Sequence, residues 1–169
     1  MVDITHKIST LRTATATAIV KVSRQETIDT VVNNLVPKGN VLEMAKTAGL
    51  FAVKNTHLSI PDCHPLPIEF TSVEYKIEGL DIHIIFNVKT VYKTGVEVEA
   101  MHGASIVALT MYDMLKPIDK EIEISTIKLI NKEGGKSSFK NKFPYAIKAA
   151  VFVCSDSIFA GHKEDRSGK

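Results

Sequence analysis

The stretch 93–116 constrains the fold more than any other part of the sequence, because it predicts one long and largely apolar helix. A helix this apolar is expected to be mostly buried, so its charged side chains need partners or a function. Glu97 and Glu99 lie near its start, and Asp113 and Lys116 lie near its end. At about 100° per residue, Glu99, Asp113 and Lys116 share one face, so we expect them to share one pocket. Glu97 points almost opposite Glu99, and we expect it either to lie in an extended segment or to serve another partner.

The same four charges also have plain structural interpretations. Asp113 and Lys116 are i,i+3 neighbours, and such pairs form surface salt bridges on helices. A glutamate in the first turn of a helix, such as Glu97, favours the helix dipole. The sequence leaves open whether Asp113 and Lys116 are solvated or form a carboxylate–ammonium pair that works in a pocket.

Composition argues against several broad classes of protein. The chain has 169 residues, 44% of them hydrophobic and 24% charged, which predicts a domain of ordinary size that folds without disulfides or metals. The net charge of +2 is too small to predict a nucleic-acid-binding protein, and no apolar run reaches the roughly 18 residues of a membrane span. Cys63 and Cys154 lie far apart and in no metal spacing, and the N-terminus carries no apolar signal segment. We expect reduced thiols in a cytoplasmic protein, with no nucleic-acid or membrane partner.

The remaining segments predict strands and helices in the order β-α-α-β-β-α-β. Threonine alternates with alanine and then valine over 13–22, a period of two that predicts a strand, and further strands are expected over 68–78, 82–92 and 121–131. Without one extra helix this order is the β-α-β-β-α-β unit of ferredoxin-like folds. The sequence therefore predicts an α+β fold with a four-stranded antiparallel sheet and helices on one face.

Local signals predict where these elements begin and end. Ser23 and Glu26 have the spacing of a capping box, which predicts a helix that Pro37 ends. Asn40 is expected to cap the second helix. In the strand after that helix, the alternation changes phase near Thr71, which predicts a β-bulge there.

The segment 60–67, IPDCHPLP, cannot form a regular element, because three prolines fix φ and remove hydrogen-bond donors. This stiff loop holds His64 beside Cys63. Because histidine exchanges protons near neutral pH, His64 is the best candidate for a proton-transfer group, although a packed histidine is an equally simple interpretation. Cys63 is expected to pack rather than to attack a substrate.

Basic turns flanked by glycine, at Lys38-Gly39 and at 134–137, are suited to bind an anion, since glycine lets backbone N–H groups approach it and lysine neutralises it. With Arg12 and Lys116 they form a cationic set that fits a polyphosphate. Each lysine alone is better explained as a solvated side chain. The histidines show no metal spacing with carboxylates, so neither a metal site nor a cofactor is expected.

Several blocks of the sequence, in order, resemble the molybdenum cofactor biosynthesis protein C family, the cyclic pyranopterin monophosphate synthases. The matching blocks extend from residue 1 to about 140 and are the following: 1–7 with Thr10 and Arg12, Lys38-Gly39, Ala48-Gly49 with Lys54, 60–67, 93–100, 109–116 and 134–137. Several blocks in the family order form a specific signal.

The resemblance implies an enzyme of molybdopterin synthesis that converts 3′,8-cyclo-7,8-dihydro-GTP to cyclic pyranopterin monophosphate with loss of pyrophosphate. It implies that Asp113 and Lys116 form the central acid–base pair, and that His64, Glu97 and Glu99 assist in proton transfer. For substrate binding it implies these residues: Arg12, Lys38, Lys54, Cys63 and Lys136. It also implies a homohexamer, a trimer of dimers with sites at the dimer interfaces, where Glu97 can meet a neighbouring subunit.

The segment 141–169 is expected to be a C-terminal extension of a synthase domain over 1–140. Within the extension, 145–154 predicts a strand and 155–168 a polar loop. It resembles the opening strand and loop of molybdopterin adenylyltransferase-type proteins in these segments: 151–157, Gly161 and 165–168. We interpret it as the incomplete start of a second domain, loosely held. Two alternatives to catalysis stay open, a non-catalytic module that binds a nucleotide triphosphate and a scaffold that assembles pathway enzymes through this extension.

Overall fold

A computed structural model of the chain describes residues 1–135, 138, 145–146, 148, 150 and 156–164. The chain divides into two compact units, 1–139 and 140–169. In the second unit, one helical turn, α5 (Asp156–Phe159), lies where the sequence predicts a polar loop. Most of the predicted strand 145–154 lies outside the described residues. The assignment of the two units as a synthase domain and the start of another domain stays a prediction.

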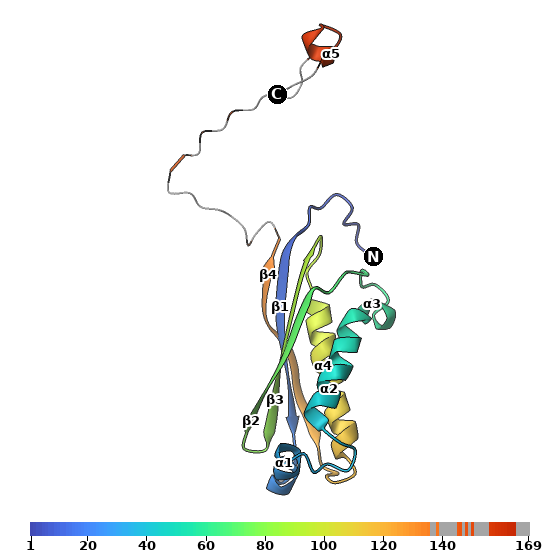
Figure 1. The fold of residues 1–169 in the computed structure, drawn as a ribbon, viewed down its shortest axis with the longest axis vertical. Coiled ribbons are helices and arrows are strands. Elements are labelled where there is room, and N and C mark those ends of the chain that lie inside the picture. Colours follow the sequence, from blue (N-terminus) through green and yellow to red (C-terminus); the bar gives the residue numbers. More distant parts are fainter. Residues whose placement is uncertain (136–137, 139–144, 147, 149, 151–155, 165–169) are drawn as a thin grey trace. The chain divides into compact units, whose positions relative to one another are not determined.

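The first unit is built on the predicted four-stranded antiparallel sheet, with helices on one of its faces (Figure 1). The strands stand in the spatial order β2-β3-β1-β4 and are β1 (Thr10–Lys21), β2 (Phe70–Glu78), β3 (Asp81–Tyr92) and β4 (Glu123–Gly134). With the helices between them, these strands form a ferredoxin-like arrangement, so the predicted α+β class is confirmed.

The alternation in β1 determines which face of the sheet is buried. Ala14, Ala16 and Ala18 belong to the core and are at most 3% exposed. Ile84 and Phe86 of the neighbouring strand β3 belong to the same core and are fully buried. Because the β1 side chains on this face are small, α4 can pack close to the centre of the sheet.

The predicted bulge near Thr71 is wrong. β2 pairs with β3 without a register shift, from Phe70 opposite Lys89 to Glu78 opposite Asp81. β2 is an edge strand whose residues are all partly exposed, so a change of phase in its polarity does not require a change of register. Register shifts occur instead where β1 pairs with β4, at two steps of β1: Thr15 to Ala16 and Ile19 to Val20.

The helices described in the first unit are α1 (Gln25–Val32), α2 (Val41–Lys54), α3 (Thr56–Ser59) and α4 (Glu97–Leu115). α2 and α4 pack against each other and cover the sheet (Figure 1). Gly49 of α2 and Gly103 of α4 both face the ring of Phe86: a Cβ atom would lie 2.8 Å from the ring at Gly49 and 2.5 Å at Gly103. Only glycine therefore lets the ring lie against both helices. In the described part of the chain, every helix is too short or too polar to cross a bilayer.

Asn40 caps α2 as predicted, since its Oδ1 accepts a hydrogen bond from the N–H of Glu43 at 3.0 Å. α1, however, ends at Val32, well before the predicted stop at Pro37. Asn34 follows with a φ of +56°, a left-handed conformation that asparagine tolerates and that ends a helix without proline.

The predicted capping box at the start of α1 is wrong. The N-cap is Arg24, whose side chain makes no capping hydrogen bond. Ser23 instead donates from its backbone N–H and its hydroxyl to the carboxylate of Asp119, at 2.8 and 2.7 Å. Asp119 lies beyond α4 and is 2% exposed, so a buried carboxylate distant in sequence binds the serine that would otherwise cap the helix.

Candidate active site

Charged side chains gather at the two ends of α4. We call Arg12, Cys63, His64, Glu97 and Glu99 the start cluster, and Lys38, Asp113 and Lys116 the end cluster. The helix from Glu99 to Asp113 is about 21 Å long at a rise of roughly 1.5 Å per residue. The prediction that Glu99, Asp113 and Lys116 share one pocket is therefore wrong within one chain, because a shared face does not shorten the distance along the axis.

In the start cluster, the thiol of Cys63 donates a hydrogen bond to Glu99 Oε1 at 3.1 Å. Glu99 is 2% exposed, and this burial raises its pKa even though the bond from Cys63 acts in the opposite direction. Burial and the bond to Glu99 raise the pKa of the Cys63 thiol to about 12. The thiol is therefore a donor rather than a nucleophile at neutral pH, and Glu99 is a buried acid that holds its proton more tightly than usual.

Glu97 is the first residue of a regular helix, so the alternative of an extended segment is wrong. Its carboxylate lies over Gly95, where a Cβ atom would collide with it, and Lys132 Nζ of β4 contacts its Oε1 at 2.8 Å. Burial raises the pKa of Glu97, but the bond from Lys132 and other favourable interactions outweigh burial and lower it overall. Glu97 thus has a partner within its own chain and remains a carboxylate, although it is two residues from Glu99.

The N-terminal arm, residues 1–9, covers the start cluster. His64 Nε2 lies 2.8 Å from the backbone oxygen of Val2, and the side chain of Asp62 forms an ion pair with the α-amino group of Met1. A cavity of about 330 Å³ lies between the arm and the start of α4, and its polar lining includes Cys63, His64, Glu97 and Glu99. The structure therefore brings the Cys63 thiol and all the predicted catalytic side chains of the start cluster to one cavity.

Arg12 lies beside this cavity, at the start of β1. Its Nε and Nη2 donate to the backbone oxygens of Tyr92 and Lys93 at 3.2 and 3.3 Å, which fixes the guanidinium group. A neighbouring cavity of about 290 Å³ is lined by Arg12, Glu97 and Lys132, among other residues. The guanidinium group thus stands close to the carboxylate of Glu97 without forming a direct ion pair with it.

In the end cluster, two lysines bind one carboxylate. Lys116 Nζ and Lys38 Nζ each lie 2.7 Å from an oxygen of Asp113, and Lys38 also donates to the Asp113 backbone oxygen at 2.8 Å. The bond from Lys116, and then that from Lys38, lowers the pKa of Asp113 to about 2, and the pKa of Lys116 is raised in turn. The i,i+3 pair that the sequence suggests is formed. The Asp113 side chain is 53% exposed, so this cluster is open to a ligand or to another protein.

The other predicted binding residues lie apart from these contacts. Lys54 ends α2 and is exposed, and its side chain makes no hydrogen bond or ion pair with another described residue. Lys136 lies outside the described residues. In the part of the chain that the structure describes, no three His, Cys, Asp or Glu side chains are placed to hold a metal ion. Sequence reasoning missed Lys132 as the partner of Glu97, since only the pairing of β4 with β1 brings it there.

The sequence has recognisable relatives. A model of the MoaC family matches residues 1–135. A cyclic pyranopterin monophosphate synthase from Clostridium perfringens (strain SM101 / Type A) is 48% identical over 139 residues, which are 81% of this chain and 87% of that protein. A probable cyclic pyranopterin monophosphate synthase from Sulfurisphaera tokodaii is 45% identical over 139 residues, 78% of this chain and 91% of that protein. A molybdenum cofactor biosynthesis bifunctional protein from Chlorobaculum tepidum is 44% identical over 168 residues. These residues are 99% of this chain, but the chain spans only 53% of the length of that protein.

Proposed function

The chain belongs to the MoaC family, and from this premise we propose that it is a cyclic pyranopterin monophosphate synthase of molybdenum cofactor biosynthesis. It converts 3′,8-cyclo-7,8-dihydro-GTP to cyclic pyranopterin monophosphate and releases pyrophosphate. The observation that carries this proposal is the likeness to synthases at 45% and 48% identity over most of both chains. We place the enzyme in the cytoplasm, where a thiol such as Cys63 stays reduced.

The chemistry of this reaction fits the two clusters. To form a cyclic monophosphate, a substrate hydroxyl attacks the α-phosphorus, a new P–O bond forms, the bond to the bridging oxygen breaks, and pyrophosphate leaves. The attacking hydroxyl loses a proton, and the ring rearrangement moves further protons, so both acids and bases are needed. Glu99 holds a proton to donate, and Asp113 stays ionised and orients Lys116 and Lys38 toward negative charge. His64 transfers protons in the cavity of the start cluster.

We further propose that each active site combines the start cluster of one copy with the end cluster of another. The two clusters are about 21 Å apart along α4, which is too far for one small substrate to contact both in one chain. An isologous dimer solves this, since two-fold symmetry can place the start of one α4 near the end of the other and so create two equivalent sites. Three such dimers would form the expected homohexamer.

The test is a pyrophosphate-release assay with the cyclised GTP derivative. We expect the full chain to release one pyrophosphate per substrate, and both Asp113→Asn and Lys116→Ala to lose about a thousandfold in kcat while melting at the same temperature as the wild type. Lys120→Ala, an exposed lysine four residues after Lys116, is the matched control and should keep the full rate. Binding of the substrate without pyrophosphate release would instead identify a non-catalytic nucleotide-binding module.

A further inference from the structure

His102 of α4 is a titratable residue that the proposed mechanism does not use. It follows Glu99 by three positions, and residues three apart on a helix lie on one face with Cβ atoms roughly 5–6 Å apart. Glu99 is 2% exposed, whereas His102 is partly exposed. His102 does not line the cavity of the start cluster, but a shallow groove between α2 and α4. It therefore lies beside the buried acid and outside the cavity that a substrate can fill.

A buried hydroxyl group fixes the ring of His102. Nδ1 lies 3.1 Å from Oγ1 of Thr56, the first residue of α3, and Thr56 is 2% exposed. The same Oγ1 lies within donating distance of the backbone oxygens of Ala52 and Val53, at 3.3 and 3.1 Å. Since a hydroxyl has one proton to donate, Nδ1 must donate to Oγ1 when a backbone oxygen accepts that proton. Nε2 makes no hydrogen bond with another described residue, so it is free to take up a second proton.

The groups that face Glu99 affect its ionisation in opposite directions. Burial has the largest effect and raises the pKa of Glu99, and the hydrogen bond from Cys63 lowers it. The charge of Glu97 raises the pKa further, and the charge of His102 lowers it. An imidazolium group beside a carboxylate favours the ionised form. His102 therefore reduces the cost of ionising this buried acid.

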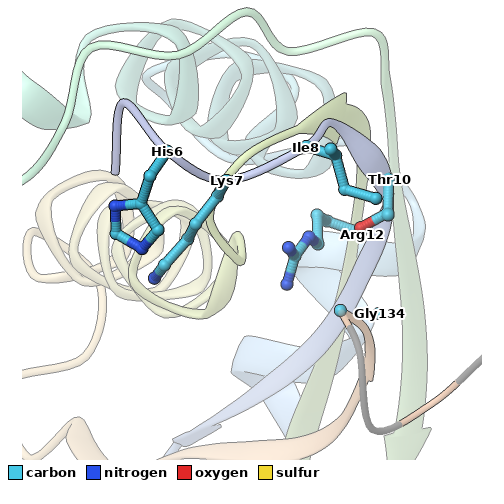
Figure 2. A pocket seen from close by; sticks show the side chains of 7 residues that line it. His6, Lys7, Ile8, Thr10, Arg12 and Gly134 are labelled. Carbon is cyan, nitrogen blue, oxygen red and sulfur yellow. The ribbon is translucent and has the colours of Figure 1, made fainter. Parts of the chain in front are cut away.

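Two other cations near the start of α4 have different surroundings. Lys7 of the N-terminal arm and Arg12 of β1 line a separate cavity of about 410 Å³, together with Gly134 of β4 (Figure 2). Backbone oxygens hold the guanidinium group of Arg12. Lys7 also lines the cavity of the start cluster, but in the described part of the chain neither side chain makes a hydrogen bond or an ion pair with Glu99. Neither cation is thus held against the buried acid.

The surroundings of His102 contain one charged neighbour on its own helix. The neighbours at three and four positions along α4 are Val98, Glu99, Ser105 and Ile106. From α2 and α3, the titratable residues next to Thr56 in sequence are Lys54 and His57, and neither lines the groove of His102. The described residues that line this groove with His102 are uncharged: Ala48, Phe51, Ala52, Asn55, Ser59 and Ile106. Glu99 is therefore the charge that His102 faces along α4.

We propose that His102 is a positioning residue for Glu99, and that it stabilises the carboxylate that remains when Glu99 has given its proton to the substrate. This role rests on the proposed function, in which Glu99 is the acid. In that step the proton passes from the Glu99 carboxyl to a substrate atom, and His102 keeps its own protons. A buried carboxylate is costly to form without a nearby cation, so His102 makes the transfer easier without contacting the substrate.

The experiment measures the pKa of Glu99 by ¹³C NMR of its side-chain carboxyl in the full chain. His102→Asn is the main variant, because an asparagine amide can still bond to Thr56 but cannot carry a charge. We expect the pKa of Glu99 to rise by about one pH unit, since an opposite charge at roughly 4–6 Å lowers a carboxyl pKa by at least that much. The alkaline limb of the kcat profile, where Glu99 loses its proton, should move up equally. The plateau should fall about threefold with KM unchanged, because a weaker acid transfers its proton more slowly.

Further variants separate charge from structure. His102→Lys keeps a positive charge at this position and should restore most of the wild-type pKa of Glu99. His83→Asn is the matched control, because it makes the same chemical change on β3 opposite Ile19, far along the sheet from Arg12. It should leave Glu99 as in the wild type. His102→Gln replaces His102→Asn if the melting temperature shows that the asparagine variant does not fold.

An unchanged pKa of Glu99 in His102→Asn or His102→Gln overturns the role of His102, and so does an equal rise in His83→Asn. A pKa in His102→Lys as high as in His102→Asn shows that the charge is not responsible and also overturns it. If the wild type releases no pyrophosphate from the cyclised GTP derivative but His102→Asn still raises the pKa of Glu99, the proposed function is wrong and the pairing of the two residues stands. If the wild type turns over, an alkaline limb that does not move in His102→Asn overturns the contribution to catalysis.

Discussion

The two ends of α4 carry the same kind of side chain in opposite environments. At the start, Glu99 is 2% exposed and burial raises its pKa; at the end, the Asp113 side chain is 53% exposed and two lysines lower its pKa to about 2. One carboxyl group therefore tends to keep its proton and the other stays ionised, although both belong to one helix. The comparison teaches that environment, rather than residue type, sets which of these groups can serve as the acid.

The largest expected effect tests whether the two ends work together across subunits. Lys116→Ala and Glu99→Gln should each be nearly inactive alone, but a co-expressed one-to-one mixture should recover about a quarter of the wild-type rate, because a quarter of the sites then combine two intact halves. The measurement is pyrophosphate release by the purified mixture. Complete inactivity of a mixture that contains both chains in one oligomer would mean that each site belongs to a single chain.

Glu99→Gln alone tests whether Glu99 is the carboxyl group that keeps its proton. We expect a loss of about a hundredfold in kcat, since glutamine cannot donate an acidic proton, with the hydrogen bond from Cys63 retained. The folded pKa of Glu99 lies above its ordinary value of 4.5, so its ionisation destabilises the wild type as the pH rises from 4.5 through the folded pKa. Thermal melts should therefore show a fall in wild-type stability over that range that is reduced in Glu99→Gln. The same fall in both proteins would contradict the raised pKa.

Asp119→Ala should destabilise the region beside the end cluster. It removes the acceptor for the backbone and hydroxyl of Ser23, for Thr27 Oγ1 at 3.0 Å and for the N–H of Glu121 at 3.1 Å. Leaving these donors unpaired should lower the free energy of unfolding by about 3 kcal/mol, as measured by urea denaturation. The hydrogen bonds of Asp119 outweigh its burial and lower its pKa below 3.8, so its contribution is present above pH 3.8 and lost as the pH falls through the folded pKa. Glu123→Ala, at an exposed position nearby, is the control and should be close to neutral.

The smallest expected effect is that of Asn40→Ala. It removes the cap of α2 beside the loop that carries Lys38 and should cost about 1 kcal/mol of stability in the same denaturation experiment. Asn40→Ser, which keeps a capping oxygen, should restore most of the loss. Because the start cluster lies at the other end of the helices, neither change should alter the pH dependence of stability that Glu99 causes. A loss well above 2 kcal/mol would mean that Asn40 does more than cap α2.

The sequence predicted the sheet and the helices because their signals are local. The alternation of Thr and Ala in β1 and the apolar run of α4 each reveal a buried face without reference to any other segment. The asparagine cap at Asn40 is local in the same sense, and it was found. The prediction of a capping box at Ser23 failed because Asp119, 96 positions away, binds the serine instead. A rule based on the spacing of nearby residues cannot include a partner so distant in the sequence.

The site was predicted less completely, for a related reason. Periodicity gives the angle of a residue around a helix axis, so it correctly separated Glu97 from Glu99. It carries no information on distance along the axis, so it missed that Asp113 and Glu99 lie at opposite ends of the helix within one chain. The bond between Cys63 and Glu99 joins a proline-rich loop to a helix, and the partner of Glu97 comes from a register-shifted strand. Contacts of this kind depend on how separate segments meet, which a single sequence does not encode in any local pattern.

The ring of Phe86 lies against both Gly49 and Gly103 and so fixes the positions of α2 and α4 on the sheet. A helix that slid or rotated on this ring would bring a Cα–Cβ bond or a backbone carbonyl into it, so α2 and α4 can shift only by breaking the core. The interval between the acidic start and the cationic end of α4 is thus a fixed length that each copy carries into the assembly. Enlarging either glycine should therefore push a helix off the ring of Phe86 and loosen the core, while the length of α4 between the two clusters stays the same.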